Sequence, residues 1–339
     1  PVGRIMYEIH AREDKVKIDF TSVAYPDDEI CNNMPDASII IPTHNRPDLL
    51  PRAVESALAA GSNVEIIVVD DASTDATAEV CRKLDSVKYI RIDRNQGVAG
   101  ARNVGILAST AKYIAFLDDD DLRLPGSLDL QVQALENSPA AGFVCGAMML
   151  ADQNYHPTGE ISVPKHGSGD AFWELLELDF PVMPLCTLIR RSCFFRVGLL
   201  NTHLHGIDDW DIFVRIAELY PIIVLREPVG LYRKPTPASG QGSSAQHAQL
   251  RRAAQHQLHL FHLPRASLAS AEKIREVRRR TLHRIADTLL WSGARGLRRG
   301  ELRAACANIS TAFSLSPLRM ARPAAYKKLA SKLADNKRK

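Results

Sequence analysis

The sequence predicts an α/β fold: a mixed, mainly parallel sheet flanked by helices, followed by a basic helical extension at the C-terminus. Short apolar runs rich in β-branched residues alternate with helical patterns from residue 37 to residue 117, which is the arrangement of β-α-β units. The charge then changes along the chain. Residues 245–339 contain 21 Lys and Arg against 5 Asp and Glu, whereas all 339 residues together have a net charge of +4. Two parts of opposite charge indicate two different roles.

Four runs in the first half are short enough to be strands and apolar enough to be buried on both faces of a sheet. They are residues 38–42, 64–70, 87–93 and 113–117. The intervening segments have the periodicity of amphipathic helices: 48–60, 74–84 and 98–108. Because crossovers between parallel strands are right-handed, we expect the ligand-binding loops at the carboxyl ends of these strands.

Beyond residue 121 the alternation is weaker, and each expected element depends on its own signal. The clearest are a helix with Pro125 in its first turn and a helix with an acidic first turn and an apolar face. The expected helices are 125–136 and 208–220, and the expected strands are 141–150, 185–190 and 222–225. In the basic region we expect a two-helix hairpin at 289–317 that turns at 295–300.

We expect four parts: a polar extension (1–36), the α/β domain (37–234), a linker or lid loop (235–244) and the basic helical region (245–339). The longest apolar run is too short to cross a bilayer as a helix, and the N-terminus lacks the pattern of a secretory signal. Six scattered cysteines without a C-x-x-C pair disfavour structural zinc. They favour buried thiols in a reducing compartment such as the cytoplasm.

Four consecutive aspartates, residues 118–121, directly follow the last strand of the first half. Adjacent carboxylates repel one another, and at the end of a buried strand they would face the ligand crevice. A hard divalent cation such as Mg²⁺ or Mn²⁺ would relieve the repulsion and would also bind substrate phosphates. We therefore expect a metal ion here; a solvated acidic turn is the alternative.

Polar residues also follow the first two strands. The turn at 42–47 (PTHNRP) is suited either to cap the next helix or to line a nucleotide site. Asp70 and Asp71 end the second strand, where a carboxylate can accept from a base N–H or a ribose hydroxyl. No G-x-G-x-x-G follows the first strand, so a dinucleotide cofactor is not expected.

Two further clusters precede or begin helices. In segment 95–103 (NQGVAGARN) the glycines permit close backbone approach at a helix start, and Arg102 can pair with a phosphate or with the acidic run. Asp208, Asp209 and Asp211 lie in the first turn of the helix at 208–220. They either satisfy the helix dipole or place a general base near the metal ion.

Five segments, taken in order, resemble the family-2 glycosyltransferases with the GT-A fold. They are SIIIPTHNRPDLL, VVDDASTDAT, NQGVAGARN, YIAFLDDDD followed by LRLP, and GIDDWDIFVR, within about residues 37–232. The resemblance implies an inverting enzyme that moves a sugar from a nucleotide-diphosphate sugar, UDP- or dTDP-linked, to an acceptor hydroxyl. The acceptor would be a glycan or a lipid-linked saccharide.

The resemblance also implies a role for individual residues. Asp209 would be the catalytic base, and Asp120 and Asp118 would ligate the divalent metal, Mn²⁺ or Mg²⁺. The family usually has a small residue where Asp119 stands, so the choice of ligand among the three aspartates stays open. The residues implied in nucleotide binding are Pro42, Thr43, Asn45, Arg46, Asp71, Gly97, Arg102, Asn103, Asp118 and Asp119.

Two other functions would use part of the same pattern of residues. A nucleotidyltransferase would also use aspartates and a metal, but it normally needs a Gly-rich loop that the turn at 42–47 lacks. A non-catalytic glycan- or nucleotide-binding module is disfavoured by the intact Asp118, Asp120 and Asp209. We expect no nucleic-acid partner. The basic region is suited to contact an anionic membrane surface, which would place a cytoplasmic protein at the inner face of the membrane; a plain solvated surface is the alternative.

Histidines and tryptophans also occur outside these motifs. His256, His259 and His262 recur near one helix face and are expected to be solvated rather than metal-binding. Trp173 and Trp210 are expected to pack in the core rather than to stack on an acceptor sugar.

Overall fold

In the computed structural model, residues 34–84, 86–234, 246–321 and 326 are described. Residues 1–33 of the expected polar extension and the expected linker at 235–244 lie outside these residues. The described residues from Pro35 onward belong to one compact unit, which contains both the sheet and the C-terminal helices.

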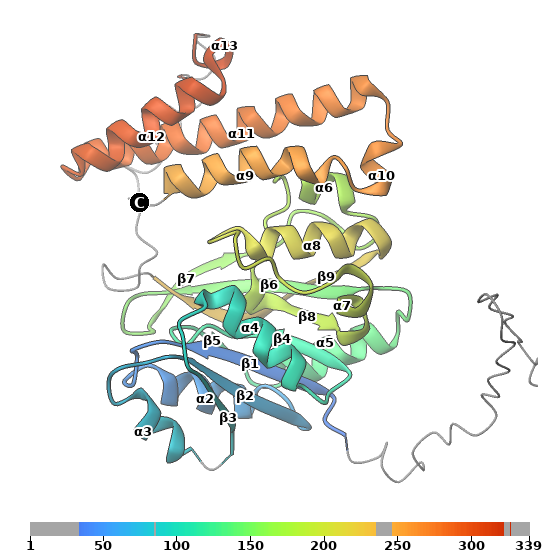
Figure 1. The fold of residues 1–339 in the computed structure, drawn as a ribbon, viewed down its shortest axis with the longest axis vertical. Coiled ribbons are helices and arrows are strands. Elements are labelled where there is room, and N and C mark those ends of the chain that lie inside the picture. The colour runs from blue at the N-terminus through green and yellow to red at the C-terminus, as the bar shows by residue number, and fades with distance from the viewer. Residues whose placement is uncertain (1–33, 85, 235–245, 322–325, 327–339) are drawn as a thin grey trace, which may run out of the picture. The chain divides into compact units, whose positions relative to one another are not determined.

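A mixed sheet forms the centre of this unit and has nine strands among the described residues (Figure 1). The strands are β1 (Ala37–Thr43), β2 (Val64–Asp71), β3 (Lys88–Ile92), β4 (Tyr113–Phe116), β5 (Leu122–Arg123), β6 (Phe143–Ala151), β7 (Pro157–Ser162), β8 (Thr187–Arg190) and β9 (Ile222–Arg233). Their order is β3-β2-β1-β4-β8-β6-β9-β5, and β7 pairs with β6. The strands from β3 to β4 in this order are all parallel, as predicted.

Helices cover the sheet and form the C-terminal region. They are α2 (Leu50–Ala59), α3 (Thr77–Arg82), α4 (Gly97–Ala108), α5 (Ser127–Glu136), α6 (Phe172–Leu176), α7 (Arg191–Val197), α8 (Asp208–Leu219), α9 (Gln246–Leu260), α10 (Pro264–Ser267), α11 (Ala271–Arg298), α12 (Leu302–Leu315) and α13 (Pro317–Met320), with a 3-10 turn at Pro184–Cys186. Figure 1 shows α9 between α8 and α11.

The alternating side chains of β1 explain why the strands of the first half are continuous apolar runs. Successive side chains of a strand point to opposite faces of the sheet. Ile39 and Ile41 belong to the core cluster on one face, and Ile40 belongs to the cluster on the other. On that second face α4 packs so closely that a Cβ at Gly105 would lie 2.4 Å from Ile40 Cγ2. Because β1 is packed on both faces, its position in the sheet is fixed, and so is the start of the loop that follows it.

The exposed hairpin and the long last strand differ from the expectation. β7 was not predicted, because its residues are all exposed and carry no apolar periodicity. β9 continues to Arg233, well past the expected end at 225, because its second half pairs with both β6 and β5. These pairings involve residues far apart in the sequence, which local patterns do not reveal.

Two of the expected helices begin three or more residues from the expected position. α3 begins at Thr77, because Asp75 Oδ1 accepts the Thr77 N–H at 2.9 Å and holds the preceding residues in a turn. α11 begins at Ala271, where the Ser270 side chain caps it by accepting the Lys273 N–H at 3.1 Å. The predicted hairpin is therefore present, but its first helix is far longer and its turn lies at 299–301.

The C-terminal helices pack on one another around a separate cluster that includes Ala254, Leu289 and Ala312. Among the described residues, no helix combines the length and the apolar character that a bilayer crossing requires. Cysteines 81, 145, 186 and 193 are buried free thiols, and Cys306 is exposed.

Candidate active site

The parallel pairing of β1 with β2 and β4 brings three loops to one edge of the sheet. These are the segments 44–49 after β1, 72–76 after β2 and 117–121 after β4. The N-terminal half of α4 and the first turn of α8 meet there too, since Arg102 of α4 contacts both Asp118 and Asp208. Open α/β sheets bind ligands outside the carboxyl ends of their strands, so this edge is the candidate site.

Asp119 is held by the last residue of β1 and by one residue of the loop that follows. Thr43 Oγ1 donates to Asp119 Oδ2 at 2.8 Å, and Arg46 Nη1 donates to Asp119 Oδ1 at 2.7 Å. The same Arg46 nitrogen lies 3.2 Å from Asp120 Oδ2. Burial raises the pKa of Asp119 to about 6, although Arg46 and Thr43 favour its ionised form. Thr43 and Arg46 therefore hold the acidic run in position next to the end of β1.

Arg102 connects the acidic run to α8. Its Nη2 donates to Asp118 Oδ1 at 2.7 Å, and its Nη1 lies 3.5 Å from Asp208 Oδ2. The guanidinium is buried against the Phe116 ring, at 5.2 Å from the ring centroid. A buried cation needs anionic partners. Because its partners come from two acidic segments, Arg102 sets how far apart those segments lie.

Asp209 follows directly in the first turn of α8. Burial is the main cause that raises its pKa to about 6; the adjacent Asp208 raises it further, and Arg102 opposes both. Asp209 Oδ1 accepts the N–H of Trp210 at 2.8 Å. A carboxylate whose pKa lies near the working pH is suited to act as a general base.

Asp71 occupies the N-terminus of α4. Its Oδ1 accepts the N–H of Gln96 at 2.7 Å, and its Oδ2 accepts the N–H of Gly97 at 2.8 Å. Gly97 has φ +74°, a conformation that glycine adopts without strain. Each carboxylate oxygen has a second lone pair, so Asp71 can still accept a hydrogen bond from a ligand.

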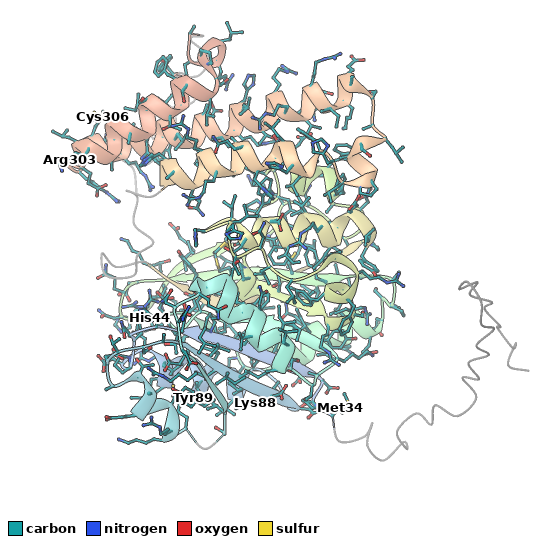
Figure 2. The ribbon with its side chains drawn as sticks, in the orientation of Figure 1. Met34, His44, Lys88, Tyr89, Arg303 and Cys306 are labelled. Carbon is teal, nitrogen blue, oxygen red and sulfur yellow. The ribbon has the colours of Figure 1, made fainter. Side chains whose placement is uncertain are left out.

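The loops after β1 and β2 are joined by Asn45. Its N–H donates to Ser73 Oγ at 3.0 Å, and its Oδ1 accepts the N–H of Thr74 at 2.8 Å. His44 lies in the same loop (Figure 2). Asn45 and Ala72 have φ of 53° and 60°; asparagine tolerates this left-handed conformation, whereas alanine is strained in it. Strained residues are frequent at functional sites, as Ala72 is here.

Two of the residues that were predicted to bind nucleotide, Asn103 and Pro42, make other contacts in the structure. The Asn103 carboxamide pairs with the backbone of Leu200 through both of its polar atoms, each at 2.9 Å. It therefore fixes the segment that leads to α8. Pro42 is buried within β1, in register with Val69 of β2.

Sequence reasoning missed a cluster of aromatic and cationic residues beside the acidic run. The Tyr155 ring lies between two guanidinium groups, with the Cζ of Arg52 at 4.7 Å and that of Arg233 at 5.2 Å from its centroid. The Arg233 N–H donates to Asp121 Oδ1 at 2.9 Å. Burial raises the pKa of Asp121 to about 8, and repulsion from neighbouring aspartates adds to it. These residues come from α2, the loop 152–156 and β9, so no local motif could have identified them.

The acidic run fits a divalent cation whose shell is completed by a ligand. Among the described residues, no three His, Cys, Asp or Glu side chains converge to hold a metal ion. Asp118 and Asp120 offer two carboxylates, and Mg²⁺ commonly takes one or two carboxylates together with substrate phosphate oxygens. Burial and repulsion from Asp118 raise the pKa of Asp120, and a bound cation would relieve both effects.

The expectation that all three C-terminal histidines are solvated was wrong for His256. Its Nε2 lies 2.7 Å from Asp211 Oδ1, and the side chain is only 13% exposed. His259 and His262 are exposed, as expected. Trp210 is buried in the core and its Nε1 donates to the carbonyl of Leu175 at 2.7 Å, as core packing requires.

Residues 38–194 match the family model described as Glycosyl transferase family 2. This match contains the loops after β1, β2 and β4 and ends before α8. It therefore covers the acidic run but not Asp209.

Two curated relatives that are similar to this chain are named as glycosyltransferases. An uncharacterised glycosyltransferase of Haemophilus influenzae is 29% identical over 184 residues, which are 53% of this chain and 62% of that protein. The Escherichia coli UDP-Glc:alpha-D-GlcNAc-diphosphoundecaprenol beta-1,3-glucosyltransferase WfaP is 35% identical over 130 residues, 38% of this chain and 51% of that protein. The chain thus spans less than two thirds of either relative.

The crystal structure of S. aureus TarS 1–349 in complex with UDP-GlcNAc has a TM-score of 0.52 and 16% identity. The alignment covers 83% of this chain and 90% of that one. At this identity the likeness concerns the fold, and the fold predicted from the sequence is confirmed.

Proposed function

We propose, from the match of residues 38–194 to the glycosyl transferase family 2 model, that the chain transfers a sugar from a nucleotide-diphosphate sugar to an acceptor hydroxyl with inversion. The observation that carries this proposal is that Arg102 connects the acidic run to Asp208, the residue directly before Asp209. It brings a candidate diphosphate-binding site and a carboxylate with a pKa of about 6 to one edge of the sheet.

Asp209 takes the proton from the acceptor hydroxyl in this reaction. The hydroxyl oxygen attacks the anomeric carbon from the side opposite the leaving nucleoside diphosphate, so one displacement inverts the configuration. Asp208 and Arg102 act on Asp209 in opposite directions, the first raising and the second lowering its pKa. The balance leaves a base that is ionised at neutral pH and still basic enough to accept a proton.

Asp118 and Asp120 would hold a divalent cation, Mn²⁺ or Mg²⁺. When bound, the cation supplies charge stabilisation for the departing diphosphate. Arg46 and Thr43 hold Asp119 beside these ligands. Asp71 and the start of α4 are suited to bind the nucleoside, since Asp71 retains acceptor capacity.

A UDP- or dTDP-linked sugar is the proposed donor, and a glycan or lipid-linked saccharide is the proposed acceptor. The fold neighbour TarS was crystallised with UDP-GlcNAc, and the relative WfaP is named for a UDP-Glc donor and a diphosphoundecaprenol-linked acceptor. A thermal-shift panel of UDP, dTDP, GDP, CMP and ADP, each with and without Mn²⁺, tests the site. At about 100 times its Kd, a ligand adds about 2.7 kcal/mol to the free energy of unfolding.

A stabilisation that needs both one nucleotide and the metal would support the donor site. Release of that nucleotide from its sugar conjugate upon addition of a lipid-linked or glycan acceptor would then support transfer. Hydrolysis of the donor without transfer to any acceptor, or no response to any nucleotide, would count against the proposal.

The tip of the hairpin between α11 and α12 is the proposed contact with an anionic membrane at the cytoplasmic face. Leu297 and Leu302 are 47% and 62% exposed there. Arg298, Arg299 and Arg303 surround them and are exposed as well; Figure 2 labels Arg303 at the outer end of the hairpin. Each basic side chain near an anionic surface contributes about 1 kcal/mol. Co-flotation with phosphatidylglycerol vesicles but not with phosphatidylcholine vesicles, lost on Arg298→Glu with Arg303→Glu, tests it.

A further inference from the structure

The basic C-terminal region reaches the candidate active site through α9. Three side chains of α9, namely Gln249, Arg252 and His256, contact the segment that precedes and begins α8. We infer that this face of α9 positions Asp209, with His256 as its central positioning residue. The inference rests on the proposed function, because it concerns the same carboxylate.

His256 contacts the first turn of α8 at Asp211, two residues after Asp209. Its Nε2 lies 2.7 Å from Asp211 Oδ1. Arg215 holds the other oxygen of Asp211, with Nε at 2.8 Å and Nη2 at 2.6 Å, and also donates to the carbonyl of Leu199 at 2.9 Å. Burial opposes ionisation of Asp211, yet these two partners hold its pKa below the usual range. The side chain therefore stays an anion that ties α8 to α9.

The segment directly before α8 is held by the other two side chains. Arg252 Nη2 donates to the carbonyl of His205 at 2.8 Å, and Gln249 Nε2 donates to the carbonyl of Gly206. Positions 249, 252 and 256 lie on one face of a helix. Gly206 has φ +76°, so the chain turns sharply here before entering α8.

The two neighbours of Asp209 in the sequence are fixed as well. Asp208 is paired with Arg102. Trp210 donates to the carbonyl of Leu175 at 2.7 Å, and its ring meets the His256 ring edge-on at 6.2 Å between centroids. A general base must lie within hydrogen-bond reach of its proton, and a displacement of about 1 Å can lower the rate by about 100-fold. Loosening α9 is therefore expected to slow the chemical step.

Arg284 offers a matched control, because it attaches the same C-terminal region to the sheet domain at another place. Arg284 Nη1 lies 2.9 Å from Glu177 Oε2, and its Nη2 lies 2.8 Å from Asp179 Oδ2. These acceptors follow α6, and no contact of Arg284 with α8 is found among its hydrogen bonds and ion pairs within the described residues. Arg284→Met tests the effect of a weaker C-terminal attachment alone.

The kinetic arm of the test compares His256→Leu, His256→Gln and Arg284→Met in the full chain. We expect His256→Leu to lower kcat by about 10- to 100-fold while KM for the donor changes by less than about 3-fold. In His256→Gln the amide N–H can still donate to Asp211, so most of the lost kcat is expected to return. Arg284→Met should lower Tm and keep kcat. An unchanged kcat in His256→Leu, or an equal loss in Arg284→Met, would overturn the inference.

The structural arm does not depend on activity. Amide hydrogen exchange of residues 205–211 is expected to be faster in His256→Leu than in the unaltered protein, and unchanged in Arg284→Met. Equal exchange in all three proteins would overturn the positioning role whatever the activity. If the unaltered protein transfers no sugar, the proposed function fails, and this arm still decides whether α9 holds the segment.

Discussion

Arg102 and Asp118 form a close ion pair, with Nη2 and Oδ1 2.7 Å apart, that connects the acidic run after β4 to the start of α8. Arg102 is 4% exposed, and its other terminal nitrogen lies 3.5 Å from Asp208. One guanidinium therefore partly neutralises carboxylates from two segments that are far apart in the sequence. Without it, the two segments would repel each other across a poorly hydrated space.

Arg102→Met is expected to lower the free energy of unfolding by about 3 kcal/mol, because it leaves carboxylates without their buried cation. Arg102→Lys keeps a charge but not the two-pronged geometry, so it should cost less. Urea unfolding of both variants measures the difference. A midpoint for Arg102→Met equal to that of the unaltered protein would mean that solvent already screens Asp118 and Asp208.

The pH dependence of transfer should report the ionisation of Asp209. Burial raises the pKa of this carboxyl to about 6, and only the ionised form can accept a proton. We therefore expect kcat/KM to rise with pH through about 6 and to level off above it. Initial rates at saturating metal across that range measure the profile. A value of kcat/KM that does not change between about pH 5 and pH 7 would contradict this assignment.

Asp209→Asn should remove transfer, keep nucleotide binding and stabilise the fold at neutral pH. The folded pKa of Asp209 is raised from 3.8 to about 6, so the folded state favours the protonated carboxyl. The stability contributed by that proton is present below pH 3.8 and is lost as the pH rises through about 6. The gain in Tm from Asp209→Asn should thus be larger above pH 6 than near pH 3.8. Equal gains in Tm at the two pH values would contradict a raised pKa for the Asp209 carboxyl in the folded state.

The first half of the fold was predictable because its signals are local. The strand β1 has side chains buried on both faces, so its apolar run is continuous and ends at the polar turn that follows. The acidic run and the acidic first turn of α8 were found for the same reason. Their charges have no packing role, so they stand out from the sequence.

The second half depends on contacts that no local pattern contains. From the sequence alone, His256 resembles an exposed helix residue. In the structure its Nε2 pairs with a carboxylate oxygen of Asp211 in α8, and the pair is partly buried. Arg52 and Arg233 both lie over the Tyr155 ring, although they come from elements near opposite ends of the domain's sequence. The roles of such residues can be identified only from the tertiary structure, because the residues they contact are distant in the sequence.

Gly105→Ala is expected to destabilise the protein by about 1–3 kcal/mol, because overpacking a close contact forces the backbone or side chains to shift. The added Cβ would lie 2.4 Å from Ile40 Cγ2, so α4 would have to move away from β1. Leu107→Ala in the same helix is a matched control, since Leu107 is 74% exposed. Thermal unfolding of the two variants measures the contrast. Equal Tm values would show that α4 can move away from β1 without lowering the stability of the protein.

Arg46→Gln tests whether Arg46 competes with a metal ion for the acidic run. Arg46 Nη1 lies 2.7 Å from Asp119 and 3.2 Å from Asp120. Two like charges cannot share these carboxylates without repulsion, so removing the guanidinium should favour the metal ion. We expect Mn²⁺ alone to bind Arg46→Gln about 10-fold more tightly, which is about 1.4 kcal/mol. Donor affinity should fall, because a cation near the diphosphate is lost.

Electron paramagnetic resonance of free Mn²⁺ measures the first effect without any donor present, and nucleotide titration measures the second. Arg52→Gln is the control, because the Arg52 guanidinium lies over the Tyr155 ring and not on the aspartates that Arg46 contacts. Weaker Mn²⁺ binding in Arg46→Gln would reverse the conclusion. Arg46 would then be the residue that holds Asp119 and Asp120 in the geometry that the metal requires, rather than its competitor.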